Sequence, residues 1–334
     1  MATIKDVAKL AGVSVATVSR YLSGASKLTG STEAKVKGAI ETLNYRPNIM
    51  ARSLSQSRSG MLMVLVSGVS SPFIGSLLSA FSKPASARGY KVLLAETSMD
   101  QKIEATYIEA LRSRLADGFV QLSAHLHPEM LDEKHTIPFV NVCECLPEAT
   151  YPTVQIDDRR AAKQITEFLV SLGHRDIACL VGLYNDQYRS PVTVKRLDGF
   201  REALDENNIE FRAEWMLQGD YTTDSGVQAA QTIAEMERRP TAVFCASDTM
   251  AIGLIRGLAN MGINVPEDIS VTGFDDIEMA KYTVPSLTTI RQPVEKIANA
   301  TINNLIDIIE EKAHVRQHVI IEHELILRGS TRRL

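Results

Sequence analysis

The first 45 residues carry apolar positions at helical spacing, separated by polar and glycine breaks. The first predicted helix follows a capping-box pattern at Thr3 and Asp6 and ends before Gly12. Its apolar stripe consists of Val7, Leu10 and Ala11. Two further stripes follow, over residues 15–22 and up to Leu43. Helix, short glycine-containing turn and helix is the helix-turn-helix pattern, so we predict a small all-α headpiece over residues 1–45.

The pattern changes near residue 60, where short apolar runs alternate with amphipathic stretches. The runs that are typical of buried strands are residues 61–66, 91–95, 118–122, 138–142, 177–181, 242–245 and 269–272. Helical stretches such as 159–172 and 196–207 fall between them. Strand–helix alternation builds parallel sheets covered on both faces. We therefore predict a two-lobed α/β core over residues 60–334, with ligand bound at the carboxyl ends of its strands.

Residues 46–59, between the two patterns, are rich in serine and arginine, which is typical of a flexible tether. Residues 48–54 are also long enough for two helical turns, which are too few to be stable alone. The sequence therefore leaves open a solvated linker and a helix that folds only on a partner.

The charge is distributed unevenly between these regions. Residues 1–58 hold nine Lys and Arg and three Asp and Glu, which gives +6 and leaves −10 of the total of −4 for the rest. A basic head on an acidic body fits a DNA reader attached to a domain that does not touch DNA.

The second predicted helix has the features of a recognition helix. Ser14 can cap it, and its exposed N-terminal residues, Ser14 included, would enter the major groove. Val15 and Ala16 offer apolar contacts, for example to a thymine methyl, and Arg20 can reach a guanine or a phosphate. The residues that suit phosphate oxygens are Thr17 and Ser19. The alternative interpretation is a capped helical hairpin that does not bind DNA.

The sequence offers little support for catalysis, metal binding or a disulfide framework. It contains no glycine-rich phosphate loop, no G-x-S-x-G elbow and no H-E-x-x-H motif, so we expect no catalytic residue, metal or cofactor. The histidines that come closest together are His125, His127 and His135, and His314 and His318. Four cysteines do not suggest a disulfide framework, and the start of the chain does not resemble a signal peptide. We expect a cytoplasmic protein without a membrane partner.

Several motifs, in order, resemble the lactose/galactose-repressor (LacI/GalR) family of bacterial transcriptional regulators. Residues 2–20, 43–48 and 51–54 resemble the family's DNA-binding head. The core motifs that resemble the family are residues 172–175, 196–200, 247–253, 273–276 and 287–290. Within the family, residues 152–157 and 324–332 are most similar to the cytidine-repressor branch, whereas the head is more similar to the galactose repressor.

The resemblance implies a core like a periplasmic binding protein. Its lobes would comprise residues 60–157 with 286–316, and residues 158–285 with 317–331. The linker at 46–59 would contain a hinge helix that docks in the minor groove, where Leu54 wedges between base pairs. The other hinge residues expected to contact DNA are Asn48, Ala51 and Arg52.

The resemblance also implies an effector pocket between the lobes. Arg196 would hold ligand hydroxyls or a carboxylate, Asp275 would accept from hydroxyls, and Tyr221 would place its ring against the ligand. Further lining positions are Ser71, Phe73, Ser123, Cys143, Ser247 and Gln292. The alternatives are a structural salt bridge between Arg196 and Asp275, and ordinary packing of Tyr221.

Two pocket positions depart from many sugar-binding relatives. Cys143, or Glu144 in a shifted alignment, stands where many carry Asp, and Ser247 stands where many carry Asn or Asp. Fewer hydroxyl acceptors put a hexose in doubt and favour a nucleoside.

The sequence therefore predicts a repressor that binds a near-palindromic double-stranded DNA operator as a homodimer and responds to a sugar or nucleoside effector. The alternatives are a ligand sensor that acts mainly through a protein partner, and a sugar- or nucleoside-processing enzyme.

Overall fold

The computed structural model describes residues 2–23, 28–46, 58–122, 137–143, 151–182, 184, 190–312 and 317–334. The chain divides into two compact units, Met1–Gly60 and Met61–Leu334. Five of the expected site residues lie outside the described residues, namely Asn48, Ala51, Arg52, Leu54 and Ser123. The predicted hinge helix lies there too.

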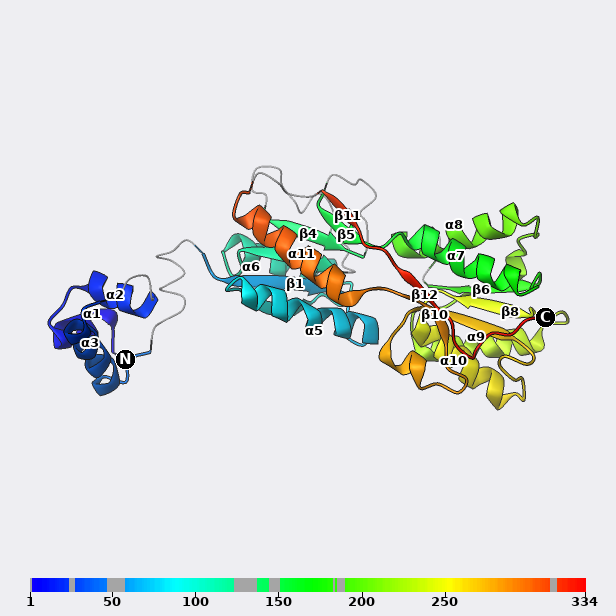
Figure 1. The fold of residues 1–334 in the computed structure, drawn as a ribbon, viewed down its shortest axis with the longest axis horizontal. Helices are drawn as coiled ribbons and strands as arrows, with labels where there is room; N and C mark the ends of the chain where they lie inside the picture. The colour runs from blue at the N-terminus through cyan, green and yellow to red at the C-terminus, as the bar shows by residue number, and fades with distance from the viewer. Residues whose placement is uncertain are drawn as a thin grey trace. The chain divides into compact units, whose positions relative to one another are not determined.

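The head consists of helices α1 (Ile4–Ala11), α2 (Val15–Ser23) and α3 (Gly30–Thr42), drawn in blue in Figure 1. The capping box forms as predicted: the Asp6 carboxylate accepts from the Thr3 backbone N–H at 2.8 Å. The small core of the head is made of Val7, Ala8, Ala11, Val18, Val36 and Ala39. Leu10, expected on the inner stripe, is 54% exposed. The face that α1 buries contains Val7, Ala8 and Ala11 instead.

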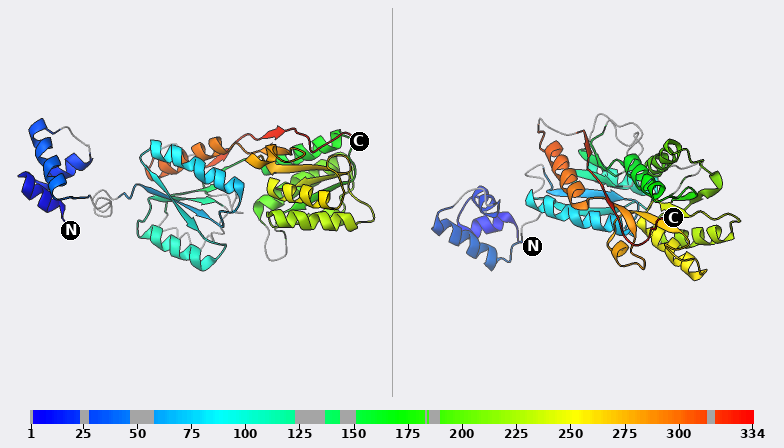
Figure 2. Two further views of the ribbon diagram at one scale, coloured as in Figure 1. Left: turned by 90° about the horizontal axis from the view of Figure 1, so that it is seen from below. Right: turned by 45° about the vertical axis from the view of Figure 1, so that its right-hand side comes forward.

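The first lobe of the core contains a six-stranded sheet. In pairing order its strands are β11 (His318–Ile320), β5 (Thr153–Gln155), β4 (Phe139–Val142), β3 (Gly118–Leu122), β1 (Met61–Val66) and β2 (Lys91–Glu96). Their pairings are parallel. Helices α5 (Pro72–Ala87) and α11 (Val294–Ile309) cover one face, and α6 (Gln101–Arg112) covers the other (Figures 1 and 2).

The second lobe repeats this plan. In pairing order its strands are β12 (Glu324–Ile326), β10 (Thr288–Arg291), β9 (Ser270–Asp275), β8 (Ala242–Cys245), β6 (Ile177–Val181) and β7 (Met216–Gln218). Only the β10–β12 pairing of this described sheet is antiparallel. The helices that cover its two faces are α7 (Asp158–Ser171) with α8 (Pro191–Glu206), and α9 (Thr223–Glu235) with α10 (Asp248–Asn260). Short 3-10 turns occupy Ala213–Trp215 and Glu278–Lys281.

The predicted fold class is confirmed: an all-α helix-turn-helix head is followed by two lobes of mainly parallel sheet. Each of the seven predicted strands is present, with ends that differ by at most three residues. Helix α8 begins at Pro191, five residues before the predicted stretch. The structure describes no helix long and apolar enough to cross a membrane.

The predicted lobe boundaries need correction at two crossings. Strand β10 pairs with β9, so residues 288–291 belong to the second lobe and not to the first. Strand β11 pairs with β5, so residues 318–320 belong to the first lobe and not to the second. The chain therefore crosses between lobes at residues 156–157, 292–293 and 321–323. Apolar pattern alone could not assign these short strands, because it does not reveal which sheet a strand joins.

Helices α9 and α10 pack closely because glycines face each other where they meet. A Cβ on Gly226 would overlap the carbonyl oxygen of Met250 and lie 3.0 Å from the Cα of Gly253. Atoms of a backbone cannot move aside as the end of a flexible side chain can. The contact therefore requires glycine.

We expect Gly226→Ala to lower the free energy of unfolding of the core by about 1–3 kcal/mol through overpacking. Urea titration of the purified protein measures the effect. Gly75→Ala is the matched control, because Gly75 lies in α5 with no atom within 4 Å of the added Cβ. An alanine there should be neutral or stabilising by about 0.5–1 kcal/mol. Equal responses of the two variants would contradict this account of the α9–α10 contact.

Candidate functional site

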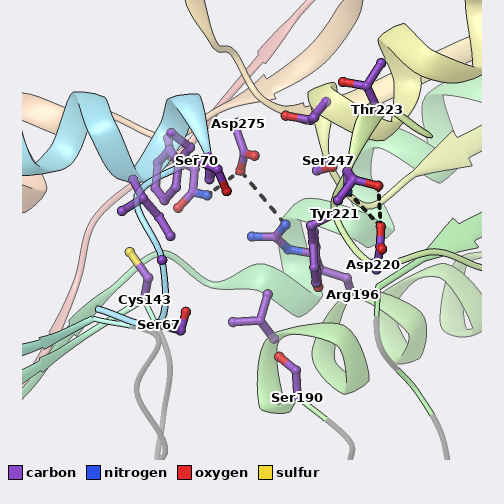
Figure 3. Close-up of a pocket in the computed structure, with 18 of the residues that line it drawn as sticks. Ser67, Ser70, Cys143, Ser190, Arg196, Asp220, Tyr221, Thr223, Ser247 and Asp275 are labelled. Carbon is purple, nitrogen blue, oxygen red and sulfur yellow. Dashed lines mark hydrogen bonds and ion pairs between the residues drawn. The ribbon is translucent and has the colours of Figure 1, made fainter. Parts of the chain in front are cut away.

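A cavity of about 530 Å³ lies between the two lobes of the core, at the carboxyl ends of their strands (Figure 3). Its walls come from the β1–α5 loop and Cys143 in the first lobe, and from loops after β7, β8 and β9 in the second. The structure brings eight of the predicted pocket residues to this cavity: Ser71, Phe73, Cys143, Arg196, Tyr221, Ser247, Asp275 and Gln292.

Arg196 is buried in the floor of the cavity, where α8 holds it. Its Nε and Nη2 each lie 2.8 Å from Oδ1 of Asp158, and Nη1 donates to the Ala246 carbonyl at 2.6 Å. The guanidinium also stacks on the Phe274 ring, 3.7 Å from its centroid. These contacts fix the plane of the guanidinium while leaving part of its edge toward the cavity.

Asp275 ends strand β9 and faces Arg196 across the floor (Figure 3). Its Oδ1 accepts from Gln292 Nε2 at 2.8 Å and lies 3.9 Å from Arg196 Nη1. Burial raises the pKa of Asp275 to about 6, although the nearby Arg196 charge and the Gln292 bond oppose that rise. Asp275 therefore holds a proton to a higher pH than an exposed aspartate does.

The structural salt bridge left open by the sequence is formed mainly with Asp158 rather than Asp275. Asp158 is 2% exposed and opens α7. Sequence reasoning missed it, because no local pattern connects an acid at one helix start with an arginine 38 residues later.

Tyr221 forms one wall of the cavity and is held from two sides. Its hydroxyl is 2.7 Å from Oγ1 of Thr193, a fully buried side chain of α8. Its ring lies so close to Gly182 that a Cβ there would overlap it. Tyr221 adopts φ 67°, in the left-handed region that non-glycine residues rarely enter. The position of the ring is therefore set by its surroundings.

The cavity is ringed by the starts of four helices. Their N-cap residues, which all line it, are Ser71 of α5, Ser190 of α8, Thr222 of α9 and Ser247 of α10. Helix N-termini present unpaired backbone N–H groups and partial positive charge, which favours ligands with oxygen acceptors. Ser190 was not predicted, although a serine before a proline is a signal for a helix start.

Ser247 and Cys143, the two positions that depart from many sugar-binding relatives, differ in their local structure. The Ser247 hydroxyl accepts from the Met250 backbone N–H at 3.2 Å and so caps α10. Cys143 is half-buried, is not in a disulfide and adopts φ 63°. Neither supplies a carboxylate to the cavity.

Helix α2 presents the predicted DNA-reading residues on its outer side. Exposed positions are Ser14, Val15, Ala16, Ser19 and Arg20, while Thr17 is half-buried. Val15 is 41% exposed, so its apolar side chain is available for an outside contact. Ser14 Oγ accepts from the Thr17 backbone N–H at 3.1 Å, so the predicted cap is present. The first turn of α2 is thus accessible to a partner.

The described part of the chain contains no group of three His, Cys, Asp or Glu residues that could hold a metal ion. Of the clustered histidines, His125, His127, His135 and His314 lie outside the described residues. His318 is exposed on β11.

Comparisons with known proteins identify both units. Residues 3–48 match the model of bacterial regulatory proteins of the lacI family, and residues 166–331 match the periplasmic binding protein-like domain. The HTH-type transcriptional repressor PurR of Vibrio campbellii is 36% identical and is covered in full, as is this chain. The HTH-type transcriptional repressor CytR of Escherichia coli is 33% identical over all of this chain and 97% of its own. These similar identities do not single out the cytidine-repressor branch.

Solved structures agree with this result. A lac repressor dimer bound to operator and the anti-inducer ONPF has 28% identity and a TM-score of 0.88, over 99% of each chain. The transcriptional regulator CelR in complex with cellobiose has 31% identity and a TM-score of 0.75, over 99% of this chain and all of its own. The chain therefore belongs to the lacI family of bacterial regulatory proteins, and it is a transcription regulator with a helix-turn-helix head and a two-lobed core.

Proposed function

We propose that this protein is a repressor that binds a near-palindromic operator as a homodimer and releases or engages it in response to a small sugar or nucleoside. The observation that carries the proposal is the convergence of eight predicted pocket residues on one cavity between the lobes. The relatives named as repressors support the DNA-binding half, and the proposal assigns the protein no catalytic step. Its place of action would be the cytoplasm, where a bacterial chromosome lies.

In the head, the proposed base-reading residues are Val15, Ala16 and Arg20. The exposed first turn of α2 supports this assignment, because a recognition helix reads base edges with its N-terminal residues. Ser14, Thr17 and Ser19 would contact phosphates. In the linker, Asn48, Ala51, Arg52 and Leu54 would complete the interface through the minor groove.

In the core, the proposed effector lies between Arg196 and Asp275, with Tyr221 covering its flat part. A pair of vicinal hydroxyls, such as those of a ribose, can accept from the guanidinium and donate to the carboxylate at once. The remaining lining residues of the proposed site are Ser71, Phe73, Ser123, Cys143, Ser247 and Gln292. An aromatic wall and few carboxylates favour a nucleoside over a hexose.

Polar substitutions at Val15 and Ala16 should change which half-site is preferred, because these two side chains would contact base edges. Selection of bound sequences from random DNA measures the preference. Lys35→Ala is the control: Lys35 is exposed on α3, and its loss should at most weaken binding to all sequences alike. If the double variant selected the wild-type sequence with unchanged discrimination, another helix would occupy the groove.

Arg196→Ala and Asp275→Ala should each abolish the ligand response. Removing one partner of a buried polar contact costs about 1–3 kcal/mol, and more where a charge is left unpaired. Thermal-shift screening of ribose, cellobiose, cytidine and adenosine on wild type identifies a ligand, and titration of the operator with and without it measures the response.

The control for that experiment is Arg238→Ala, which removes a surface ion pair with Asp176 in the same lobe. With an inducer, the two pocket variants should keep the ligand-free operator affinity of wild type. With a co-repressor, they should bind operator poorly under all conditions. A full wild-type response in both would place the pocket elsewhere.

Asp275→Asn should reduce the pH dependence of stability. The pKa of Asp275 in the folded protein, about 6, exceeds its ordinary value of 3.8, so the folded state binds the proton more tightly than the unfolded state. Asp275 therefore lowers the free energy of unfolding as pH rises from about 4 through about 6.

Between about pH 4 and about pH 7, the difference in unfolding free energy should shift by about 2–3 kcal/mol in favour of Asp275→Asn. Urea titrations across this range measure it. Asp176→Asn, at an exposed ion pair, serves as the control. Parallel pH profiles for wild type and Asp275→Asn would contradict the prediction.

A further inference from the structure

The three crossings between the lobes lie beside one another. Strands β5 and β11 approach them from the first lobe, and the Ile321 N–H donates to the Gln155 carbonyl at 2.8 Å. The third crossing is held to α7 by Glu322, which pairs with Arg160 at 3.2 Å. Figure 1 shows the connecting segments running together between the lobes. A change in the angle between the lobes must therefore pass through these few residues.

The first crossing leads directly into the floor of the pocket. Asp158 follows residues 156–157 and opens α7. Its carboxylate receives two donors from Arg196, each at 2.8 Å, and both side chains are nearly inaccessible to solvent. Arg196 thus ties the pocket to the residue at which the chain enters the second lobe.

The second crossing leads there as well. Gln292 lies within it, between β10 and α11, and is 3% exposed. Its side chain donates to Asp275 Oδ1 at 2.8 Å, and its backbone N–H donates to the Asp275 carbonyl at 3.3 Å. Asp275 thus ties the pocket to the residue at which the chain leaves the second lobe.

The Asp158–Arg196 pair and the Gln292–Asp275 pair face each other without a hydrogen bond between them. Arg196 Nη1 lies 3.9 Å from Asp275 Oδ1, the same oxygen that accepts from Gln292. That separation permits an ionic attraction but exceeds the length of a hydrogen bond. The four residues Asp158, Arg196, Asp275 and Gln292, which we call the pocket network, therefore form two hydrogen-bonded halves joined by a looser ion pair. Figure 3 shows that ion pair between Arg196 and Asp275.

We infer that Asp158 and Gln292 are positioning residues that connect the effector pocket to two of the three lobe crossings, and that effector binding acts on the crossings through them. The inference rests on the proposed function, in which Arg196 and Asp275 hold the effector. A ligand hydroxyl that accepts from Arg196 and donates to Asp275 replaces the loose ion pair with two hydrogen bonds. The ligand thereby changes the hydrogen bonds between Arg196 and Asp158 and between Gln292 and Asp275. Because these bonds hold the two crossings to the pocket, it also changes how firmly each crossing is held.

The network also couples the crossings without a ligand, because its members compete. When Gln292 no longer donates to Asp275, the carboxylate should attract Arg196 and draw it from Asp158, which loosens the first crossing. When Asp158 loses its charge, Arg196 should move onto Asp275 and displace Gln292 from the shared oxygen, which loosens the second crossing. Each substitution therefore acts on the crossing it does not belong to.

Hydrogen exchange of the ligand-free, full-length protein tests this directly. The reporters are two backbone amides just past the crossings: Ala161, which donates to Asp157, and Ile297, which donates to Pro293. Gln292→Met should speed exchange at Ala161, and Asp158→Asn should speed exchange at Ile297, each by about fivefold or more. A purely structural role would change exchange only at the variant's own crossing.

Asp176→Asn is the matched control, since it removes the charge from an Arg–Asp pair of the same lobe that is not at a crossing. It should leave both amides at wild-type rates. Circular dichroism verifies folding, and if Asp158→Asn does not fold, Gln292→Met alone decides. Exchange at the distant amide within twofold of wild type, in every folded variant, would overturn the inference. A wild-type ligand response in Arg196→Ala would instead overturn the proposed function, so the two failures are distinguishable.

Discussion

The arrangement of the pocket depends on one buried charge. Arg196 is 5% exposed, and its guanidinium has an anion, a carbonyl and an aromatic face as partners. A charge removed from water is tolerated only with such compensation, and its neighbours are consequently constrained in place. Burial lowers the pKa of Arg196, but the combined effect of Asp158, Asp275 and Tyr221 outweighs it and raises that pKa, so the guanidinium stays charged. Around this fixed cation, the carboxylate of Asp275 and the start of α7 take their positions.

The parallel sheets explain why the sequence predicted so much of the pocket. Loops at the carboxyl ends of parallel strands meet at one edge of each sheet, and two lobes bring two such edges together. Ser71 follows β1, Ser247 follows β8 and Asp275 ends β9, so residues far apart in the sequence reach one cavity. The apolar runs that identify strands also identify where those loops begin. Resemblance to a family then indicated which loop residues to choose.

What escaped prediction was long-range pairing. Leu10 fits a helical stripe but lies outside the head's core, because the face that α1 buries is decided by α2 and α3. Strands β10 and β11 were assigned to the wrong lobes, since three-residue and four-residue strands carry too little pattern to show their sheet. No sequence pattern indicated the role of Asp158, because its partner, Arg196, lies in another helix. In each case the deciding contact is tertiary.

Four residues that line the cavity hold backbone conformations that suit glycine: Met99 at φ 57°, Cys143 at φ 63°, Tyr221 at φ 67° and Asp275 at φ 117°. Such conformations each cost about 1–3 kcal/mol, which the remainder of the fold must offset. The strain is concentrated where side chains face the cavity, so the site and the stability of the core make opposing demands on the same backbone. A sequence evolving for thermal stability alone would drift toward glycine at these positions and lose the sulfur, the ring and the carboxylate. Thermostable variants selected without regard to ligand are therefore a route by which this regulator would become unresponsive while remaining folded.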